Sequence, residues 1–182
     1  MEKTLEEYNT AITYCKNIFL SKMRDYGSSW RILRPSSLTD QIYIKAQRIR
    51  SIEEKGIAKI SEGIKPEFAG IVNYSAVAVI QIQLAGYYEL NLSLDEAITH
   101  YNAQIKAARD LMMDKNHDYG EAWRNMRVSS LTDIILMRLM RIKQIEDNDG
   151  KVAVSEGPES NYLDMINYAV FALIKMSNGE NY

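Results

Sequence analysis

Apolar residues recur every three or four positions along most of the chain, the spacing of one helix face. In the first segment they are Leu5, Tyr8, Ile12, Cys15, Phe19 and Met23. Thr4 and Glu7 have the spacing of a capping box, and Gly27 can adopt the left-handed conformation that ends a helix. The pattern predicts a first helix from Thr4 to about Gly27.

Two more helices are predicted before the next polar connector. The second covers about 37–54, where Ser37 and Asp40 have N-cap spacing. The third follows Pro66 and ends near Gly86, because proline suits a first helical turn. The free amides at the start of the second helix could instead hold a phosphate, and the sequence leaves both interpretations open.

The same series then occurs a second time. The segment Asp25–Asp40, DYGSSWRILRPSSLTD, matches Asp118–Asp133, DYGEAWRNMRVSSLTD, at eleven of sixteen positions. A capping box at Ser93 and Glu96 opens the second set. Its three predicted helices cover about 93–116, 130–147 and 159–176. An internal repeat of this length indicates a duplicated supersecondary unit.

Corresponding residues lie 93 positions apart through Glu53 and Glu146, and 94 apart from Asn73 and Asn167 onward. Three helices cannot easily bury their apolar faces alone, and the connector at 87–92 is short. We therefore predict an all-α protein in which two tandem three-helix repeats, residues 1–92 and 93–182, pack as one pseudo-twofold bundle.

Composition and charge restrict the class of protein to which the chain can belong. The 182 residues are 46% hydrophobic and 25% charged, as in ordinary globular proteins, and the net charge of -2 argues against a general electrostatic grip on nucleic acid. The N-terminus lacks a signal-peptide core, Cys15 is the sole cysteine, and Asn73 interrupts the most apolar stretch, 68–86. We expect a cytoplasmic protein without a membrane span; a homo-oligomer is compatible with the pattern.

Aromatic and arginine side chains recur together between the first and second predicted helices of each copy. Packing beneath the loop would explain the rings, and stacking on a base with phosphates on the arginines would explain both. The candidate contacts are Tyr26, Trp30, Arg31 and Arg34 in the first copy and Tyr119, Trp123, Arg124 and Arg127 in the second.

The later helices add further candidates. Lys45 and Arg48 share one helix face, as do Arg138 and Arg141 in the second copy, where they could neutralise phosphates. Asn167 lies within an apolar face, so its amide needs a partner, either a neighbouring helix or a ligand.

Acidic residues around the last hairpin predict a magnesium site. Glu146 ends one helix, and Glu156 and Asp164 flank the start of the next. Carboxylates brought together by a hairpin suit Mg²⁺, whereas solvated charges at helix ends are the alternative interpretation.

The order of these motifs, Asp-Tyr-Gly, Trp-Arg, paired basic residues, an acidic segment and then Asp164 to Tyr168, resembles the nucleotide modification associated domain 1 family, once per copy. The resemblance implies a helical domain placed by association in nucleotide or modified-base metabolism. More distantly, the chain is similar to all-α MazG-type nucleoside triphosphate pyrophosphatases, which implies Mg²⁺-dependent hydrolysis. The acidic residues here, however, stand at other intervals than in that family.

The leading hypothesis is therefore a protein that binds a small nucleotide. If the protein is an enzyme, the expected reaction is Mg²⁺-dependent hydrolysis of that nucleotide. The alternative is a non-enzymatic binding or scaffold module whose repeated motif only caps and packs helices.

Overall fold

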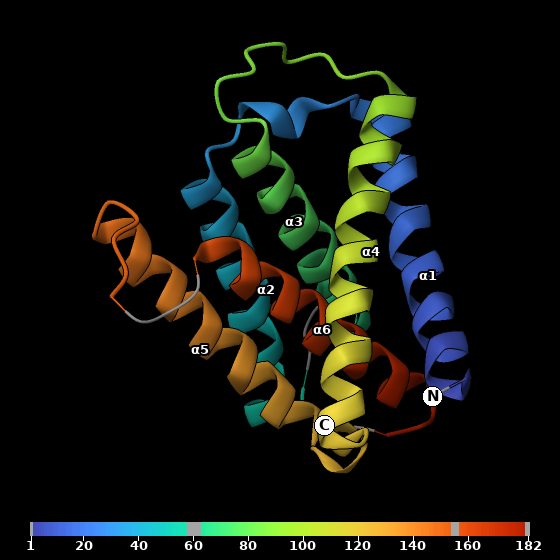
Figure 1. The fold of residues 1–182 in the computed structure, drawn as a ribbon. Helices are drawn as coiled ribbons and strands as arrows, with labels where there is room; N and C mark the ends of the chain where they lie inside the picture. Colours follow the sequence, from blue (N-terminus) through green and yellow to red (C-terminus); the bar gives the residue numbers. More distant parts are fainter. Residues whose placement is uncertain (1, 58–62, 154–156, 181–182) are drawn as a thin grey trace.

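The computed structural model describes residues 2–57, 63–153 and 157–180, which form α-helices and short 3₁₀-helices and contain no strand (Figure 1). The all-α prediction is confirmed. The elements are α1 (Glu2–Tyr26), η1 (Ser29–Ile32), α2 (Pro35–Lys55), α3 (Lys65–Gln83), α4 (Leu94–Tyr119), η2 (Ala122–Asn125), α5 (Val128–Asp147) and α6 (Pro158–Ser177).

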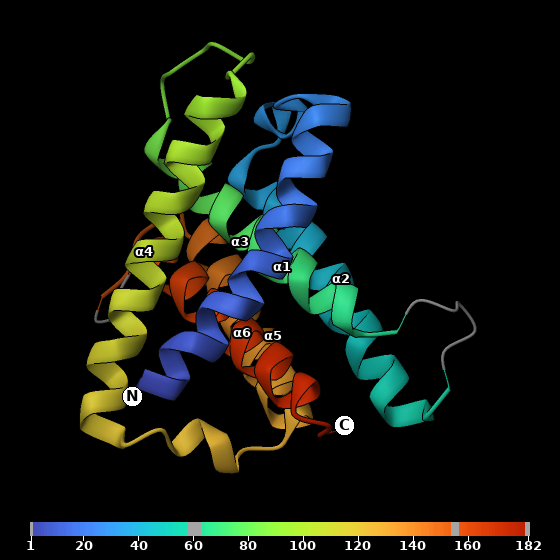
Figure 2. The same ribbon diagram turned by 90° about the vertical axis from the view of Figure 1, so that its right-hand side faces the viewer.

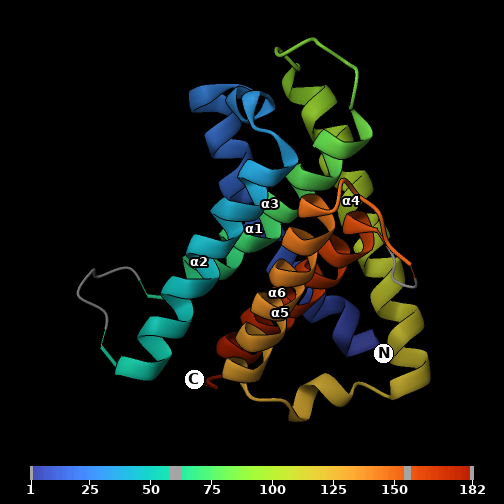
Figure 3. The same cartoon turned by 90° about the vertical axis from the view of Figure 1, so that its left-hand side faces the viewer.

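Helices α3 and α6 form the centre of the molecule and pack directly on each other. Helix α2 covers α3, α5 covers α6, and α1 and α4 lie against the other side of this central pair (Figures 1, 2 and 3). Almost every side chain of the middle of α3 and α6 is buried, which explains why these two segments are the most apolar in the chain. None of the described helices combines the length and apolarity needed to cross a membrane.

Buried tyrosine–asparagine pairs link the two repeats reciprocally. Tyr8 on α1 donates a hydrogen bond of 2.8 Å to Asn167 on α6, and Tyr101 on α4 donates one of 2.8 Å to Asn73 on α3. Each asparagine amide also donates to a backbone carbonyl of the helix packed beside it, at 3.0 Å in the first repeat and 2.8 Å in the second. Each repeat thus supplies the tyrosine that satisfies the other's asparagine amide, which is buried in Asn167 and partly buried in Asn73.

A second reciprocal contact joins α2 and α5. The Thr39 hydroxyl donates to Glu146 at 2.7 Å, and the equivalent Thr132 donates to Glu53 at 2.8 Å. Burial between the helices raises the pKa of both glutamates, although the threonine hydrogen bonds oppose the shift. The repeats therefore contact each other through the same surface patch, as subunits do in a twofold dimer.

Two of the predicted helix starts are wrong. Helix α2 begins at Pro35 and α5 at Val128, and neither has a side-chain cap. Ser37 and Ser130 consequently lie inside the first turn. The aspartates expected to answer them form ion pairs across the α2–α5 contact, Asp40 with Lys143 at 2.9 Å and Asp133 with Arg50 at 3.6 Å.

Of the two capping boxes predicted for α1 and α4, one exists. The hydroxyl of Ser93 accepts from the backbone of Glu96, whose side chain accepts from the backbone of Ser93. Thr4, by contrast, is buried within α1, which already includes Glu2. The Thr4 hydroxyl instead donates a hydrogen bond to Glu121, a long-range contact that local spacing does not reveal.

Candidate functional site

A pocket of 340 Å³ opens in the second repeat, between the end of α4, η2 and the facing sides of α5 and α6. Predicted contact residues from four different elements meet there. Those lining the pocket are Tyr119, Trp123, Arg138, Asp164 and Asn167. Helix α4 ends at Gly120, whose φ of 58° is left-handed, and the chain then turns into η2 and brings Trp123 over the pocket.

Asp164 is the electrostatic centre of this pocket. Its carboxylate is 5% exposed and lies 2.5 Å from the ammonium of Lys115 and 2.9 Å from the guanidinium of Arg138. A second nitrogen of Arg138 donates to Asn161 at 3.1 Å. The three charged groups leave an excess of one positive charge beside an open volume, an arrangement that favours an anion.

The indole of Trp123 forms the wall between η2 and α6. It stacks on Phe171 with ring centroids 4.3 Å apart and an interplanar angle of 3°. The guanidinium carbon of Arg124 lies 4.4 Å from the indole centroid. Since parallel stacking leaves no room for a guanidinium on the same side, both indole faces are covered. The prediction that Trp123 stacks on a base therefore does not fit this geometry.

Another ring remains accessible at the pocket rim. The side chain of Tyr119 is 75% exposed, and Tyr168 of α6 lines the same pocket. Deeper inside, the indole nitrogen of Trp123 and the Nε atom of Arg138 are buried and have no hydrogen-bond partner among the described residues. Such unsatisfied donors are costly and rare in folded proteins.

The repeated arginine of the second copy binds protein, not an open surface. Arg124 pairs with Glu121 at 2.6 Å and with Glu7 of α1 at 2.7 Å, and donates to the hydroxyl of Thr4 at 2.6 Å. Thr4 in turn donates to Glu121. The hydrogen bonds from Thr4 and Arg124 lower the pKa of Glu121 to about 2. Arg124 thus clamps the start of α1 onto η2.

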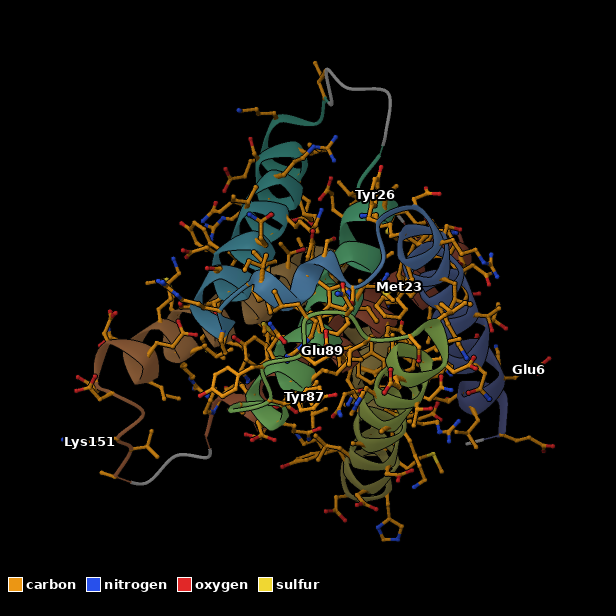
Figure 4. The ribbon with its side chains drawn as sticks, turned by 90° about the horizontal axis from the view of Figure 1, so that it is seen from above. Glu6, Met23, Tyr26, Tyr87, Glu89 and Lys151 are labelled. Carbon is orange, nitrogen blue, oxygen red and sulfur yellow. The ribbon has the colours of Figure 1, made fainter. Side chains whose placement is uncertain are left out.

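The equivalent arginine of the first copy clamps the connector between the repeats. The buried guanidinium of Arg31 donates to the carbonyls of Tyr87 and Glu89 at 2.5 Å and 3.2 Å, and also to Gln81. Figure 4 shows Tyr87 and Glu89 together on the connector. Arg31 and Arg124 therefore serve packing, whereas Arg34 and Arg127 are exposed at the starts of α2 and α5.

In the first repeat, a lysine side chain lies where the second repeat has the side chain of Asp164. Gly70 is the counterpart of Asp164, and a β-carbon on Gly70 would lie 2.7 Å from two side-chain carbons of Lys45. The ammonium of Lys45 lies 3.2 Å from Glu67, which also pairs with Arg48 at 2.7 Å. Lys45 and Arg48 are thus engaged by one carboxylate of their own repeat.

The aromatic pair of the first repeat is also arranged differently. The Trp30 indole nitrogen donates to the sulfur of Met23 at 3.2 Å, so it has the partner that Trp123 lacks. Tyr26 is 69% exposed. Of the first-copy candidates, Tyr26 and Arg34 therefore remain at the surface without assembling a charged pocket.

The predicted metal ligands lie in different surroundings. Glu146 accepts from Thr39, and Asp164 is paired with two cations. Glu156 lies outside the described residues. Within 2–57, 63–153 and 157–180 no group of three or more acidic, histidine or cysteine side chains is placed to hold a metal ion. The magnesium site stays a prediction.

Sequence reasoning missed Lys115, Asn161 and Phe171. For Lys115 a signal was available, because the first copy has Lys22 at the equivalent position. Phe171 corresponds to Val77, and Asn161 to Glu67, so the repeat gave no indication that either residue supports a site.

Comparisons with known proteins agree with the internal repeat. A family model described as nucleotide modification associated domain 1 matches residues 22–82 and again 115–176, together about two thirds of the chain. No curated protein and no solved structure matches the chain significantly.

Proposed function

The chain belongs to the nucleotide modification associated domain 1 family and carries that domain twice, and on this premise we propose that its second repeat binds a nucleotide in the pocket beside Asp164. The site is formed by α4, η2, α5 and α6 of one repeat, so it needs no residue from a second molecule.

The observation that carries this proposal is a buried carboxylate, Asp164, that two more exposed cations contact beside a pocket and that folding does not require. Buried ion pairs are costly to desolvate and are weak evidence for stability. The first repeat builds the same helices with Gly70 in place of Asp164 and with Lys45 lying in the space. The cluster of Lys115, Arg138 and Asp164 in an open pocket is therefore better explained by a ligand than by packing.

Each part of a nucleotide has a matching group. Lys115 and Arg138 supply positive charge for a phosphate, and the rings of Tyr119 and Tyr168 supply aromatic surface for a base. The unpartnered nitrogens of Trp123 and Arg138 could donate to ligand oxygens. Both are shielded from solvent, so a ligand reaches them only after side chains at the pocket edge shift. The volume of 340 Å³ is near the lower end of small-molecule sites.

Binding has more support than hydrolysis. To hold Mg²⁺ directly, Asp164 would have to exchange its contacts with Lys115 and Arg138 for the metal. Glu146 is half-buried and hydrogen-bonded to Thr39 in the contact between α2 and α5. The same ligand panel that tests binding also tests hydrolysis, if phosphate and pyrophosphate release are followed with and without Mg²⁺.

The experiment is isothermal titration calorimetry with ribo- and deoxyribonucleotides against the wild type, Arg138→Met and Lys45→Met. Methionine keeps most of the apolar stem and removes the charge at equivalent positions of the two repeats. We expect at least one nucleotide to bind the wild type and Lys45→Met alike, and Arg138→Met to bind at least about tenfold more weakly, the loss of one charged hydrogen bond.

Circular dichroism and melting temperature show whether each variant is folded before it is titrated. The proposal is contradicted if no nucleotide binds the wild type at millimolar concentration, or if Lys45→Met and Arg138→Met weaken binding equally.

A further inference from the structure

A second groove lies next to the pocket, along α5 toward the hairpin that leads to α6. It has a volume of 690 Å³ and is lined on one side by a single face of α5. The lining residues on that face follow helical spacing: Met137, Met140, Arg141, Gln144 and Ile145 in α5, and Asn148 directly after it. Eleven helical steps span about 16 Å, so the groove is long enough to hold a ligand group of its own.

Arg138 joins this groove to the pocket, because its side chain lines both. One guanidinium nitrogen contacts Asn161, which lines the groove, and another contacts Asp164, which lines the pocket. A ligand in the pocket with its phosphate on Arg138 therefore has its phosphate at the entrance of the groove.

The groove combines apolar surface with positive charge. Met137 and Met140 are 42% and 51% exposed, large values for methionine side chains facing a cavity. Arg138 and Arg141 supply the charge, and no carboxylate is among the described residues that line the groove. Lys151 also lines it, but Figure 4 shows its side chain at the outer end of the hairpin, pointing away from the body.

These two properties match a phosphate followed by a second ring. Phosphates alone would use the arginines and leave the methionine surface uncovered. A base would cover it, since methionine sulfur packs favourably against aromatic rings and its flexible side chain adapts to their shape. A single phosphate between two rings also agrees with the absence of a strong overall positive charge.

We propose that the ligand is a pair of nucleosides joined by one phosphodiester. The first nucleoside lies in the pocket beside Asp164, the phosphate on Arg138 and Arg141, and the second base on Met137 and Met140. The inference rests on the proposed function, which supplies the first nucleoside. The same chemistry is present in a free dinucleotide and in a nucleic-acid strand, and the experiment separates these sources.

The test compares a mononucleotide, a dinucleotide and a six-nucleotide single strand by calorimetry. The variants are Met137→Ser, Arg141→Ala and, as the matched control, Ile44→Ser. Ile44 is the counterpart of Met137 on α2 and is 60% exposed, so both serine variants alter an equivalent surface position. Neither change removes a buried side chain.

In the wild type, the dinucleotide should bind about tenfold more tightly than the mononucleotide, an increase typical of one stacked base. Met137→Ser should reduce this advantage and leave mononucleotide affinity unchanged. Arg141→Ala should weaken the binding of both ligands, because both place their phosphate on Arg141, whereas Ile44→Ser should change neither affinity. A strand that binds as tightly as the dinucleotide identifies a nucleic-acid source, and a strand that binds more weakly identifies a free dinucleotide.

Equal affinity for mononucleotide and dinucleotide would overturn the inference and leave the proposed function standing, because the pocket would then bind one nucleotide and the groove nothing. An equal loss of dinucleotide affinity in Met137→Ser and Ile44→Ser would also overturn it. If no nucleotide binds at all, the proposed function itself fails.

Discussion

The two repeats share their helices, their reciprocal contacts and most of their central motif, yet they differ in the position of one carboxylate on the last helix. The first repeat has Glu67 followed three residues later by Gly70; the second has Asn161 followed by Asp164. The acid has moved one helical turn. In the first repeat, Glu67 pairs with Lys45, whose side chain lies against the backbone of Gly70. In the second repeat, Asp164 lines the pocket.

This difference separates the residues that both repeats use for packing from those that line the candidate site. The buried tyrosine–asparagine pairs and the threonine–glutamate pairs occur in both repeats, so they belong to the common helical frame. The cluster of Lys115, Arg138 and Asp164 occurs in the second repeat alone among the described residues. The first repeat, which lacks this cluster, thus serves as a control for the candidate site in the second repeat.

The largest predicted asymmetry in stability concerns the two tryptophans. Trp123 is buried and stacked on Phe171, whereas Trp30 is partly exposed. Trp123→Ala should lower the free energy of unfolding by about 4 kcal/mol, since truncating a buried aromatic leaves a cavity. Trp30→Ala should cost about half as much, because less of its surface is buried. Urea unfolding measures both, and equal costs would contradict the difference in packing.

The asparagines should instead behave alike. Asn73→Leu and Asn167→Leu each leave a buried tyrosine hydroxyl and a backbone carbonyl without a partner. Each should cost about 2–3 kcal/mol of unfolding free energy. Urea unfolding of the two variants should agree within about 0.5 kcal/mol, the usual error of such comparisons. A clear inequality would show that the reciprocal contacts are not equivalent.

A smaller effect should appear at acid pH. Glu121, whose pKa falls to about 2, corresponds to the neutral Ser28 of the first repeat. A carboxyl with a lowered pKa stabilises the folded state above its unfolded pKa, near 4.5, and loses that contribution as pH falls toward 2. Glu121→Gln should cost about 1 kcal/mol at neutral pH.

Thermal unfolding between neutral pH and acid should therefore show the wild type and Glu121→Gln converging below pH 4.5. Ser28→Ala should change stability by an amount that does not depend on pH in this range, because serine does not titrate. Parallel curves for the wild type and Glu121→Gln would contradict the proposed role of the Thr4 and Arg124 contacts.

The fold could be predicted because it depends on patterns that repeat locally. Apolar spacing located every helix, and Gly27, Gly56 and Gly120 end helices in the left-handed conformation that glycine tolerates. The helix starts were harder: Ser37 and Asp40 have capping spacing, but the helix already begins at Pro35, whose fixed φ suits a first turn.

Some members of the candidate site could be predicted from the sequence, but their contacts could not. Arg138 and Tyr119, predicted as ligand contacts, and Asp164, predicted as a metal ligand, line one pocket of the second repeat. Arg124 was expected to meet a ligand and instead binds Glu7, a residue 117 positions away. No local pattern encodes such a contact, and only packing shows that the arginine is already satisfied.

The number of nucleotides bound per chain tests the central claim most directly. Equilibrium dialysis or calorimetry with a nucleotide that binds should give one site per chain, because the pocket is open in the second repeat, whereas Lys45 occupies the position of the Asp164 side chain in the first. That site should weaken sharply in Arg138→Met and persist in Lys45→Met. Two equal sites per chain, or a single site that Arg138→Met leaves intact, would contradict the assignment.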